Sequence, residues 1–213
     1  MPGFADPFDG ALTSEAQLRE LYPPPAGIST RKQLDRLDDG CRALIALAPI
    51  AFLASHDAAG RCDVTPRGGP PGFVAALDDH HVAIPDATGN RRLDTLRNVV
   101  ETGQAALIFV TPGRDWTLRV NGRACVTARP DVLERLTPVG KPPRTAIVVA
   151  CDEVYTHCPK AFVRSALWDP ASWPAAADQP SPAAVVHAHL GDPAISLADV
   201  EQALEESLRH RLA

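Results

Sequence analysis

The sequence lacks several features that would assign it to common classes of protein. Its five cysteines include no CxxC pair, which argues against a zinc ribbon or a thioredoxin-type site. It has no run of about 20 apolar residues, the length a membrane span requires. It also lacks an excess of basic residues, since the formal net charge of -5 argues against a nucleic-acid-binding surface. We therefore expect a globular protein that binds neither nucleic acid nor membrane.

The N-terminus also lacks the basic start and apolar core of a signal peptide, so we expect a cytoplasmic protein with reduced thiols. A chain of 213 residues can form one domain with appendages. Prolines concentrate at Pro23–Pro25 and between residues 170 and 193, which predicts boundary segments. We expect an N-terminal extension with a short helix at 1–28, a central domain at 29–170, and a Pro/Ala-rich linker with a C-terminal helix at 171–213.

Apolar periodicity predicts short strands with a few helices between them. Strands are expected at 50–55, 61–65, 73–77, 82–84, 104–110, 116–127 and 145–155. Helices are expected at 13–21, from 29 or 30 to 48, from 90 to 102, and at 130–136, 159–166 and 197–212. The absence of strand–helix–strand alternation disfavours a doubly wound sheet. The hairpins instead predict a mainly β, α+β protein with an antiparallel barrel or sandwich and flanking helices.

The most distinctive stretch runs from Ile84 to Asp94. An apolar strand ends at a proline, a short polar loop follows, and the expected helix opens with Arg91 and Arg92 in its first turn. First turns carry free N–H groups and the positive end of the helix dipole, so they usually attract acidic residues. Two cations there indicate a bound anion, and a phosphate fits because arginine grips it bidentately. The alternative is a pair of solvated surface arginines.

Four segments, taken in order, resemble a known family. They are DVTPRG with PPGF at 63–73, IPD with GNRRLD at 84–94, PGRD with LRVNGRA at 112–124, and HC with KA, RS and LW at 157–168. Together they cover about residues 30–170. The chain thereby resembles the pyridoxamine 5′-phosphate oxidase-related, FMN-binding split-barrel family. The resemblance implies a split antiparallel β-barrel with flanking helices, which binds FMN between the two subunits of a homodimer.

The resemblance also implies roles for individual residues. The cofactor-binding candidates are Arg67, Asn90, Arg91 and Arg92 at the phosphate, Pro85 and Asp86 along the isoalloxazine ring with Ile84 just before them, and Arg119 and Asn121 facing the partner's flavin. In better-known members a Ser-Arg-Lys-type triplet stands where this chain has Asn90-Arg91-Arg92, a change that keeps the cations. The Trp-Arg pairing of the vitamin B6 oxidases is not reproduced, so we expect a different small-molecule substrate.

Residues after the last expected strand are candidates for the substrate side of the site: His157, Cys158, Lys160, Arg164 and Trp168. Cys158 is either a reactive thiol at a helix start or an inward-packed side chain. Trp168 either covers the flavin or anchors the end of the domain. No catalytic residue and no metal ligand is assigned.

The function that the resemblance implies is an FMN-dependent oxidoreductase that transfers a hydride or electrons to or from a small molecule, with the flavin carrying the redox step. Two alternatives stay open. One is a non-catalytic flavin-binding or sensing protein that uses the same pocket. The other is a split-barrel protein that binds a deazaflavin or haem.

Overall fold

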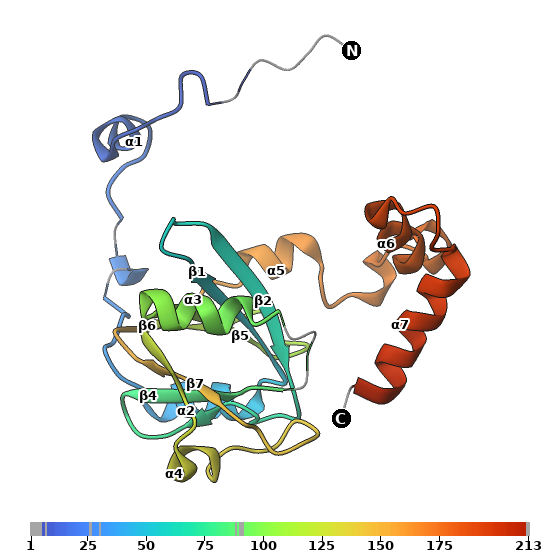
Figure 1. Ribbon diagram of the computed structural model, residues 1–213. Helices are drawn as coiled ribbons and strands as arrows, with labels where there is room; N and C mark the ends of the chain where they lie inside the picture. Colours follow the sequence, from blue (N-terminus) through green and yellow to red (C-terminus); the bar gives the residue numbers. More distant parts are fainter. Residues whose placement is uncertain are drawn as a thin grey trace. The chain divides into compact units, whose positions relative to one another are not determined.

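The computed structural model describes residues 6, 8–25, 27–29, 31–87, 89 and 92–211 (Figure 1). The chain divides into two units, Met1–Gln33 and Leu34–Ala213. The first contains α1 (Glu15–Leu21) and the short 3-10 helix η1 (Gly27–Ser29). Ser14 caps α1 and forms a reciprocal capping box with Gln17, which explains why this predicted helix forms.

The second unit contains an eight-stranded sheet with helices around it. The strands are β1 (Ile50–His56), β2 (Cys62–Gly68), β3 (Ala75–Ala76), β4 (His81–Pro85), β5 (Gln104–Val110), β6 (Thr117–Thr127), β7 (Ala146–Ala150) and β8 (Glu153–His157). The helices are α2 (Asp39–Leu47), α3 (Asp94–Thr102), α4 (Pro130–Leu133), α5 (Lys160–Ser165), η2 (Pro170–Ser172), η3 (Ala176–Asp178), α6 (Pro182–Leu190) and α7 (Leu197–Arg211).

Every strand pairing is antiparallel, in the order β2-β1-β5-β6-β7-β4-β3, with β8 paired to β6. The long strand β6 changes partner along its length: residues 117–121 pair with β8 and residues 124–127 with β7. Within the described ranges no backbone pairing joins β2 to β3 or β4, so the sheet stays open. The predicted split antiparallel barrel with flanking helices is confirmed as this open sheet.

The core lies on the inner face of the sheet, where every second residue of a strand is buried. The largest fully buried side chains there include Leu53, Ile84, Leu107, Leu118, Val120, Val149 and Val154. α2 adds Ile45 and α3 adds Val99 to the same cluster. α3 packs on β1, β2, β5 and β6, across the sheet in Figure 1. Burial of these side chains, at about 25 cal/mol per Å² of apolar surface, is the main term that holds α3 on the sheet.

A glycine lets the chain cross β6 where that strand changes partner. A Cβ built on Gly122 would lie 1.7 Å from the carbonyl oxygen of Ala150 and 3.0 Å from the amide nitrogen of Asp152. The Asp152 amide donates to the Asn121 carbonyl at 3.0 Å across the same contact. The connection between β7 and β8 therefore runs directly over the backbone of β6.

Two expected elements differ from the structure near this crossing. The predicted single strand at 145–155 is wrong: it is divided into β7 and β8, because the chain turns over β6 at Cys151 and Asp152. The predicted start of the second helix at residue 29 or 30 is also wrong, since α2 begins only at Asp39. Leu34 exchanges backbone hydrogen bonds with Val154 of β8 instead, at 2.9 and 2.8 Å.

The start of α2 is set by Asp38, whose side chain accepts a hydrogen bond from the Cys41 amide at 2.7 Å. We expect Asp38→Ala to lower the free energy of unfolding by about 1 kcal/mol at neutral pH, the usual cost of losing an N-cap. The cap lowers the pKa of Asp38, so its contribution is present above the ordinary value of 3.8 and is lost as the pH falls through the folded-state value. Urea unfolding at several pH values measures this, with Asp38→Asn as the capping control. An equal deficit in Asp38→Asn would contradict the assignment.

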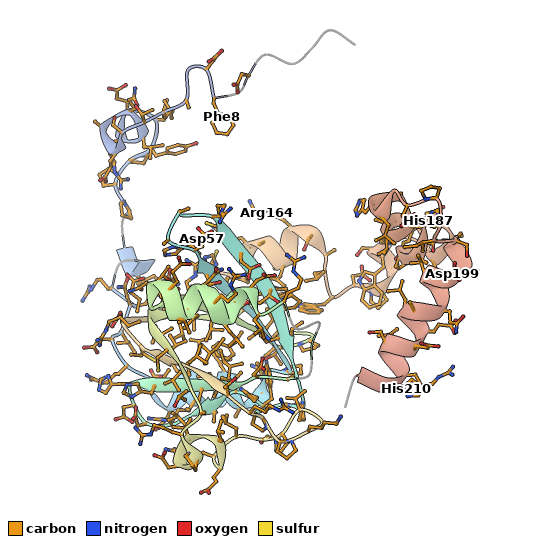
Figure 2. The ribbon with its side chains drawn as sticks, viewed as in Figure 1. Phe8, Asp57, Arg164, His187, Asp199 and His210 are labelled. Atoms are coloured by element: carbon orange, nitrogen blue, oxygen red, sulfur yellow. The ribbon has the colours of Figure 1, made fainter. Side chains whose placement is uncertain are left out.

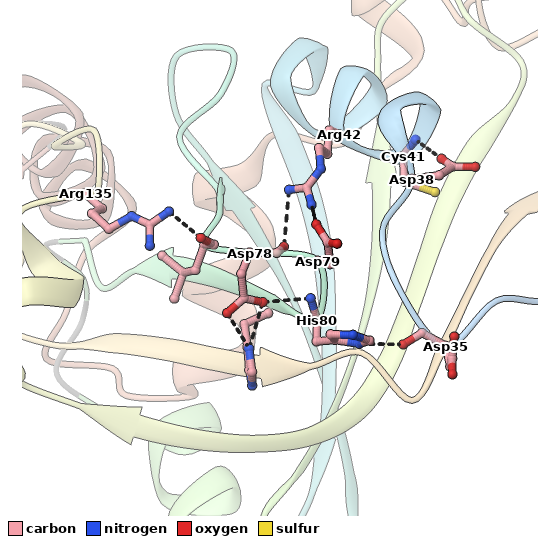
Figure 3. Close-up of polar contacts among 10 residues, drawn as sticks. Asp35, Asp38, Cys41, Arg42, Asp78, Asp79, His80 and Arg135 are labelled. Carbon is pink, nitrogen blue, oxygen red and sulfur yellow. Dashed lines mark hydrogen bonds and ion pairs between the residues drawn. The ribbon is translucent and has the colours of Figure 1, made fainter.

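The turn between β3 and β4 is held by a group of charged side chains (Figure 3). Asp78 accepts hydrogen bonds from the His80 amide at 2.7 Å and, on both carboxylate oxygens, contacts the His81 ring nitrogen Nδ1 at 2.9 Å. Arg42 of α2 pairs with Asp79 and donates to the Asp78 carbonyl. These contacts fasten the start of β4 to α2.

The residues after 170 contain more structure than the expected linker and single helix. The C-terminal helix is confirmed as α7, but α6 also forms within the Pro/Ala-rich segment, with Ser181 as its N-cap. The two helices contact each other and bury Ala183 and Val200. None of the helices in the described ranges combines the length and the apolar character needed to cross a membrane.

Candidate functional site

The sheet is open between β2 and the end of β4, and this gap is called the seam below. The seam brings together two of the predicted cofactor residues. Arg67 lies on β2, at one end of the strand order, and Asp86 directly follows β4, near the other end. Nη1 of Arg67 and Oδ1 of Asp86 are 3.8 Å apart, and the two side chains are 23% and 28% exposed. The sheet therefore curves until its two ends meet at this ion pair.

The inner face of β2 is polar where the neighbouring strands are apolar. Asp63, Thr65 and Arg67 occupy alternate positions and are half-buried, whereas the residues between them are exposed. Sequence reasoning missed Asp63 and Thr65 as part of this face. The signal was present, because three polar residues at a period of two in a strand next to a buried one place polar groups toward the interior.

α3 is fastened to this polar face by two side-chain hydrogen bonds. The Thr95 hydroxyl, in the first turn of α3, donates to Oδ2 of Asp63 at 3.1 Å. Asn98 donates to the Ser55 hydroxyl of β1 at 3.0 Å. Thr95 and Ser55 are both buried, so each bond satisfies a group that would otherwise be costly to remove from water. The start of α3 is thereby held on the strand that carries Arg67.

Arg67 has an unused donor at the seam. Its Nε is buried and has no hydrogen-bond partner in the part of the chain that the structure describes. Burial raises the pKa of Asp86, and the Arg67 charge opposes that rise. A half-buried guanidinium with a free N–H is a site for an anion, because arginine donates in a planar fork that matches phosphate and carboxylate oxygens.

The predicted start of this helix is wrong. α3 begins at Asp94 rather than near Asn90, so Arg92 lies outside its first turn, and Asp94 is the acidic residue usual there. Arg92 lies before the helix and donates from Nε to Asp94 at 2.8 Å. Leu93 between them adopts a left-handed conformation, with φ 61°, which costs about 1 kcal/mol for a non-glycine residue.

The helix dipole therefore gives no reason to place a phosphate between two first-turn arginines. Asn90 and Arg91, the two other predicted phosphate ligands of this segment, lie outside the described residues. Of the predicted phosphate ligands in this segment, the structure describes Arg92. It lies just before α3, the helix that Thr95 fastens to β2.

The residues predicted to line the ring lie at the end of β4. Ile84 is 1% exposed and belongs to the core, and Pro85 is also buried. Both pair with β7, Ile84 with Ile147 and Pro85 with Ala146. The Asp86 amide continues this ladder by donating to the Thr145 carbonyl at 2.9 Å. Of the three, only Asp86 presents a side chain at the seam.

Arg119 and Asn121 lie on the opposite face of the sheet from Arg67. Nη1 of Arg119 donates to the Tyr155 hydroxyl at 2.9 Å. Asn121 donates to Oε2 of Glu153 at 2.9 Å. The partners Tyr155 and Glu153 of β8 were not predicted as site residues, because the pairing of β8 with β6 was not visible in the sequence. The structure thus separates these two candidates from the seam within one chain.

This outer face also exposes apolar side chains. Across the strands, Pro66, Phe52, Ile108 and Arg119 are successive register partners and lie in one row. Phe52 is 39% exposed, and Val64, in the neighbouring row, is 64% exposed. The face is therefore apolar at β1 and β2 and polar at β6 and β8.

Four of the substrate-side candidates follow one another along the chain. His157 ends β8, Cys158 is exposed in the turn that follows, and Lys160 begins α5. Arg164, near the end of α5 (Figure 2), donates back to the Lys160 carbonyl at 3.1 Å. Cys158 is exposed, so the inward-packed alternative for this thiol does not hold.

The fifth candidate, Trp168, is held against protein groups. Its ring stacks on Phe162 of α5 with 5.8 Å between the ring centroids, and its indole N–H donates to the Arg114 carbonyl at 3.0 Å. Trp168 therefore anchors α5 to the turn between β5 and β6, the second of the two roles considered for it.

The cysteines offer little for redox chemistry in the interior. Burial raises the pKa of Cys41 to about 11 and that of Cys151 to about 12, so both thiols stay protonated at neutral pH. Within the described ranges there is no group of three His, Cys, Asp or Glu side chains that could hold a metal ion.

Comparison with protein families gives a sequence match. The family model for pyridoxamine 5′-phosphate oxidase matches residues 37–158, more than half of the chain and all eight strands. A search of the curated proteins finds no match.

Several solved structures are similar to the chain. HupZ of Group A Streptococcus is 18% identical, with 56% of this chain and 93% of that chain covered and a TM-score of 0.46. A candidate pyridoxamine 5′-phosphate oxidase of Lactobacillus delbrueckii is 21% identical, with 58% and 98% covered and a TM-score of 0.46. An FAD binding protein of Mycobacterium smegmatis is 12% identical, with 58% and 97% covered and a TM-score of 0.41.

Proposed function

The chain belongs to the pyridoxamine 5′-phosphate oxidase family, and on that premise we propose that it is a flavin-binding protein that holds FMN at the seam of its sheet. The observation that carries this proposal is Arg67, whose buried Nε lacks a hydrogen-bond partner among the described side chains. A phosphate oxygen at this position accepts a hydrogen bond from Nε and neutralises the charge of the guanidinium. The 3.8 Å contact between Arg67 and Asp86 neutralises that charge only in part.

The residues around the seam fit the two ends of the cofactor. Arg67 and Arg92 hold the phosphate, together with Asn90 and Arg91 of the same segment. Pro85 and Asp86 border the isoalloxazine ring, chiefly through the backbone, because the Ile84 and Pro85 side chains are buried. The bound flavin supplies hydride or electron transfer, and the protein binds, orients and shields it.

A homodimer completes the site in this proposal. Arg119 and Asn121 lie on the outer face and do not reach the seam of their own chain, so their role toward a flavin requires a second subunit. The exposed Phe52 and Val64 on that face support it, because apolar surface of this kind marks interaction sites. His157, Cys158, Lys160 and Arg164 then border the small-molecule substrate.

Identification of the bound cofactor tests the proposal. We expect protein purified from a flavin-containing host to be yellow and to release FMN on heat denaturation, near one per subunit, as measured by absorbance spectrum and mass. Release of a deazaflavin or haem would replace FMN as the ligand. Failure to bind added FMN, riboflavin or FAD would contradict flavin binding altogether.

The same preparation separates an oxidoreductase from a flavin-binding or sensing protein. An oxidoreductase reduces its flavin rapidly with a nicotinamide donor and reoxidises it with an acceptor over many turnovers. Stopped-flow absorbance at the flavin band measures both half-reactions. A flavin that is bound but is not reduced by nicotinamide would leave binding intact and contradict the redox role.

A further inference from the structure

The contact between Arg67 and Asp86 leaves both partners incompletely satisfied. The 3.8 Å separation of Nη1 and Oδ1 is longer than a charge-assisted hydrogen bond, which is about 2.7–2.9 Å. Arg67 also keeps its buried Nε without a partner among the described residues. Asp86 therefore lowers the free-energy cost of burying the Arg67 guanidinium, but it accepts no hydrogen bond from the N–H groups of Arg67.

A phosphate bound at Arg67 would meet the Asp86 carboxylate at close range. Two anions that share one half-buried cation repel each other, and water screens them weakly there. The Asp86 carboxylate therefore opposes phosphate binding at Arg67 for as long as it keeps its contact with the guanidinium.

We infer that the Asp86 carboxylate competes with phosphate for Arg67 and so sets how tightly the seam holds an anionic ligand. The inference rests on the proposed function and deepens it by naming the residue that regulates affinity. Asp86 acts here as a specificity-determining residue: it weakens the binding of phosphorylated ligands more than that of unphosphorylated ones.

The backbone around Asp86 allows this exchange without a change in the sheet. The Asp86 amide donates to the Thr145 carbonyl at 2.9 Å, and Pro85 pairs with Ala146. The main chain at residue 86 is thus fixed by β7, and the carboxylate leaves Arg67 by rotation of its side chain.

Titration of the Asp86→Asn variant tests this inference. Calorimetric binding of FMN, riboflavin and inorganic phosphate is compared with that of the wild type. We expect Asp86→Asn to bind FMN and inorganic phosphate at least about tenfold more tightly, because juxtaposed like charges are costly in a partly desolvated site. Riboflavin, which lacks the phosphate, is expected to gain less affinity than FMN.

A gain in FMN affinity distinguishes competition from a purely structural role, which would lower the affinity. Asp131→Asn is the matched control, since it removes an exposed carboxylate paired with Arg129 at 2.6 Å on α4. Equal or weaker FMN binding by Asp86→Asn would overturn the inference, as would an equal gain in riboflavin affinity.

The phosphate titration separates failure of this inference from failure of the proposed function. If neither protein binds FMN, the flavin proposal is wrong, and tighter phosphate binding by Asp86→Asn still supports competition at Arg67. If phosphate binding is equal or undetectable in both proteins, competition is overturned as well.

Discussion

Gly122→Ala is expected to lower the free energy of unfolding by at least about 3 kcal/mol, and to prevent folding if the free energy of unfolding of the wild type is no larger than this. The added methyl would lie 1.7 Å from the Ala150 carbonyl oxygen, and no rotamer change relieves this clash because the backbone fixes the position of Cβ and the oxygen is itself a backbone atom. Relief requires the β7–β8 connection to move off β6, which breaks the hydrogen bond from the Asp152 amide to Asn121.

Soluble yield and urea unfolding of the purified variant measure this effect. Gly68→Ala is the matched control: it is also a strand glycine, but a Cβ there meets only the Pro49 carbonyl oxygen at 3.6 Å, an ordinary contact. We expect the control to unfold within about 1 kcal/mol of the wild type, the range of strand propensities. A Gly122→Ala protein of wild-type stability would show that the chain does not cross β6 at this point.

Arg67→Gln is expected to weaken FMN binding by about 10- to 100-fold. A hydrogen bond to a charged group contributes about 1.5–3 kcal/mol, and each 1.4 kcal/mol corresponds to a tenfold change in affinity. Loss of Arg67 also leaves Asp86 as an unpaired carboxylate facing the phosphate, which adds to the loss. Quenching of flavin fluorescence during titration measures the dissociation constant.

The control for Arg67 lies in the same hairpin. Arg61 pairs with Asp57 at 2.6 Å in the β1–β2 turn, and its side chain is 84% exposed. Arg61→Gln removes the same charge and is expected to leave FMN binding unchanged within twofold. Circular dichroism establishes that both variants are folded. If Arg67→Gln binds FMN as tightly as the wild type, the phosphate does not lie at the seam.

The strands of this protein can be predicted from sequence where the alternation of apolar residues lies within the strand itself. β1, β5 and β6 have apolar residues at every second position and bounded ends, and the structure places them within one residue of expectation. β7 and β8 were merged because their boundary comes from a crossing over Gly122, and such a contact between distant segments leaves no local pattern. α2 was extended because Leu34 continues an apolar helical spacing but pairs with β8 instead.

The site was predicted in part, and for a reason that the structure corrects. Arg67, Asp86 and Arg92 were named, but the dipole argument required a helix start at Asn90. The left-handed Leu93 places that start at Asp94, and nothing in its side chain signals such a conformation. The meeting of Arg67 and Asp86 follows from the curvature of the whole sheet, which no single segment encodes.

The seam allows the two edges of the sheet to separate locally. In the described part of the chain, β2 has a backbone ladder with β1 alone, and the contact recorded across the gap to Asp86 is an ion pair between side chains. Separating the two edges therefore breaks no main-chain hydrogen bond, and local opening of this kind has a free energy well below that of global unfolding. We therefore expect a ligand held there to enter and leave where the two edges separate, while the β5–β6–β7 ladder stays intact.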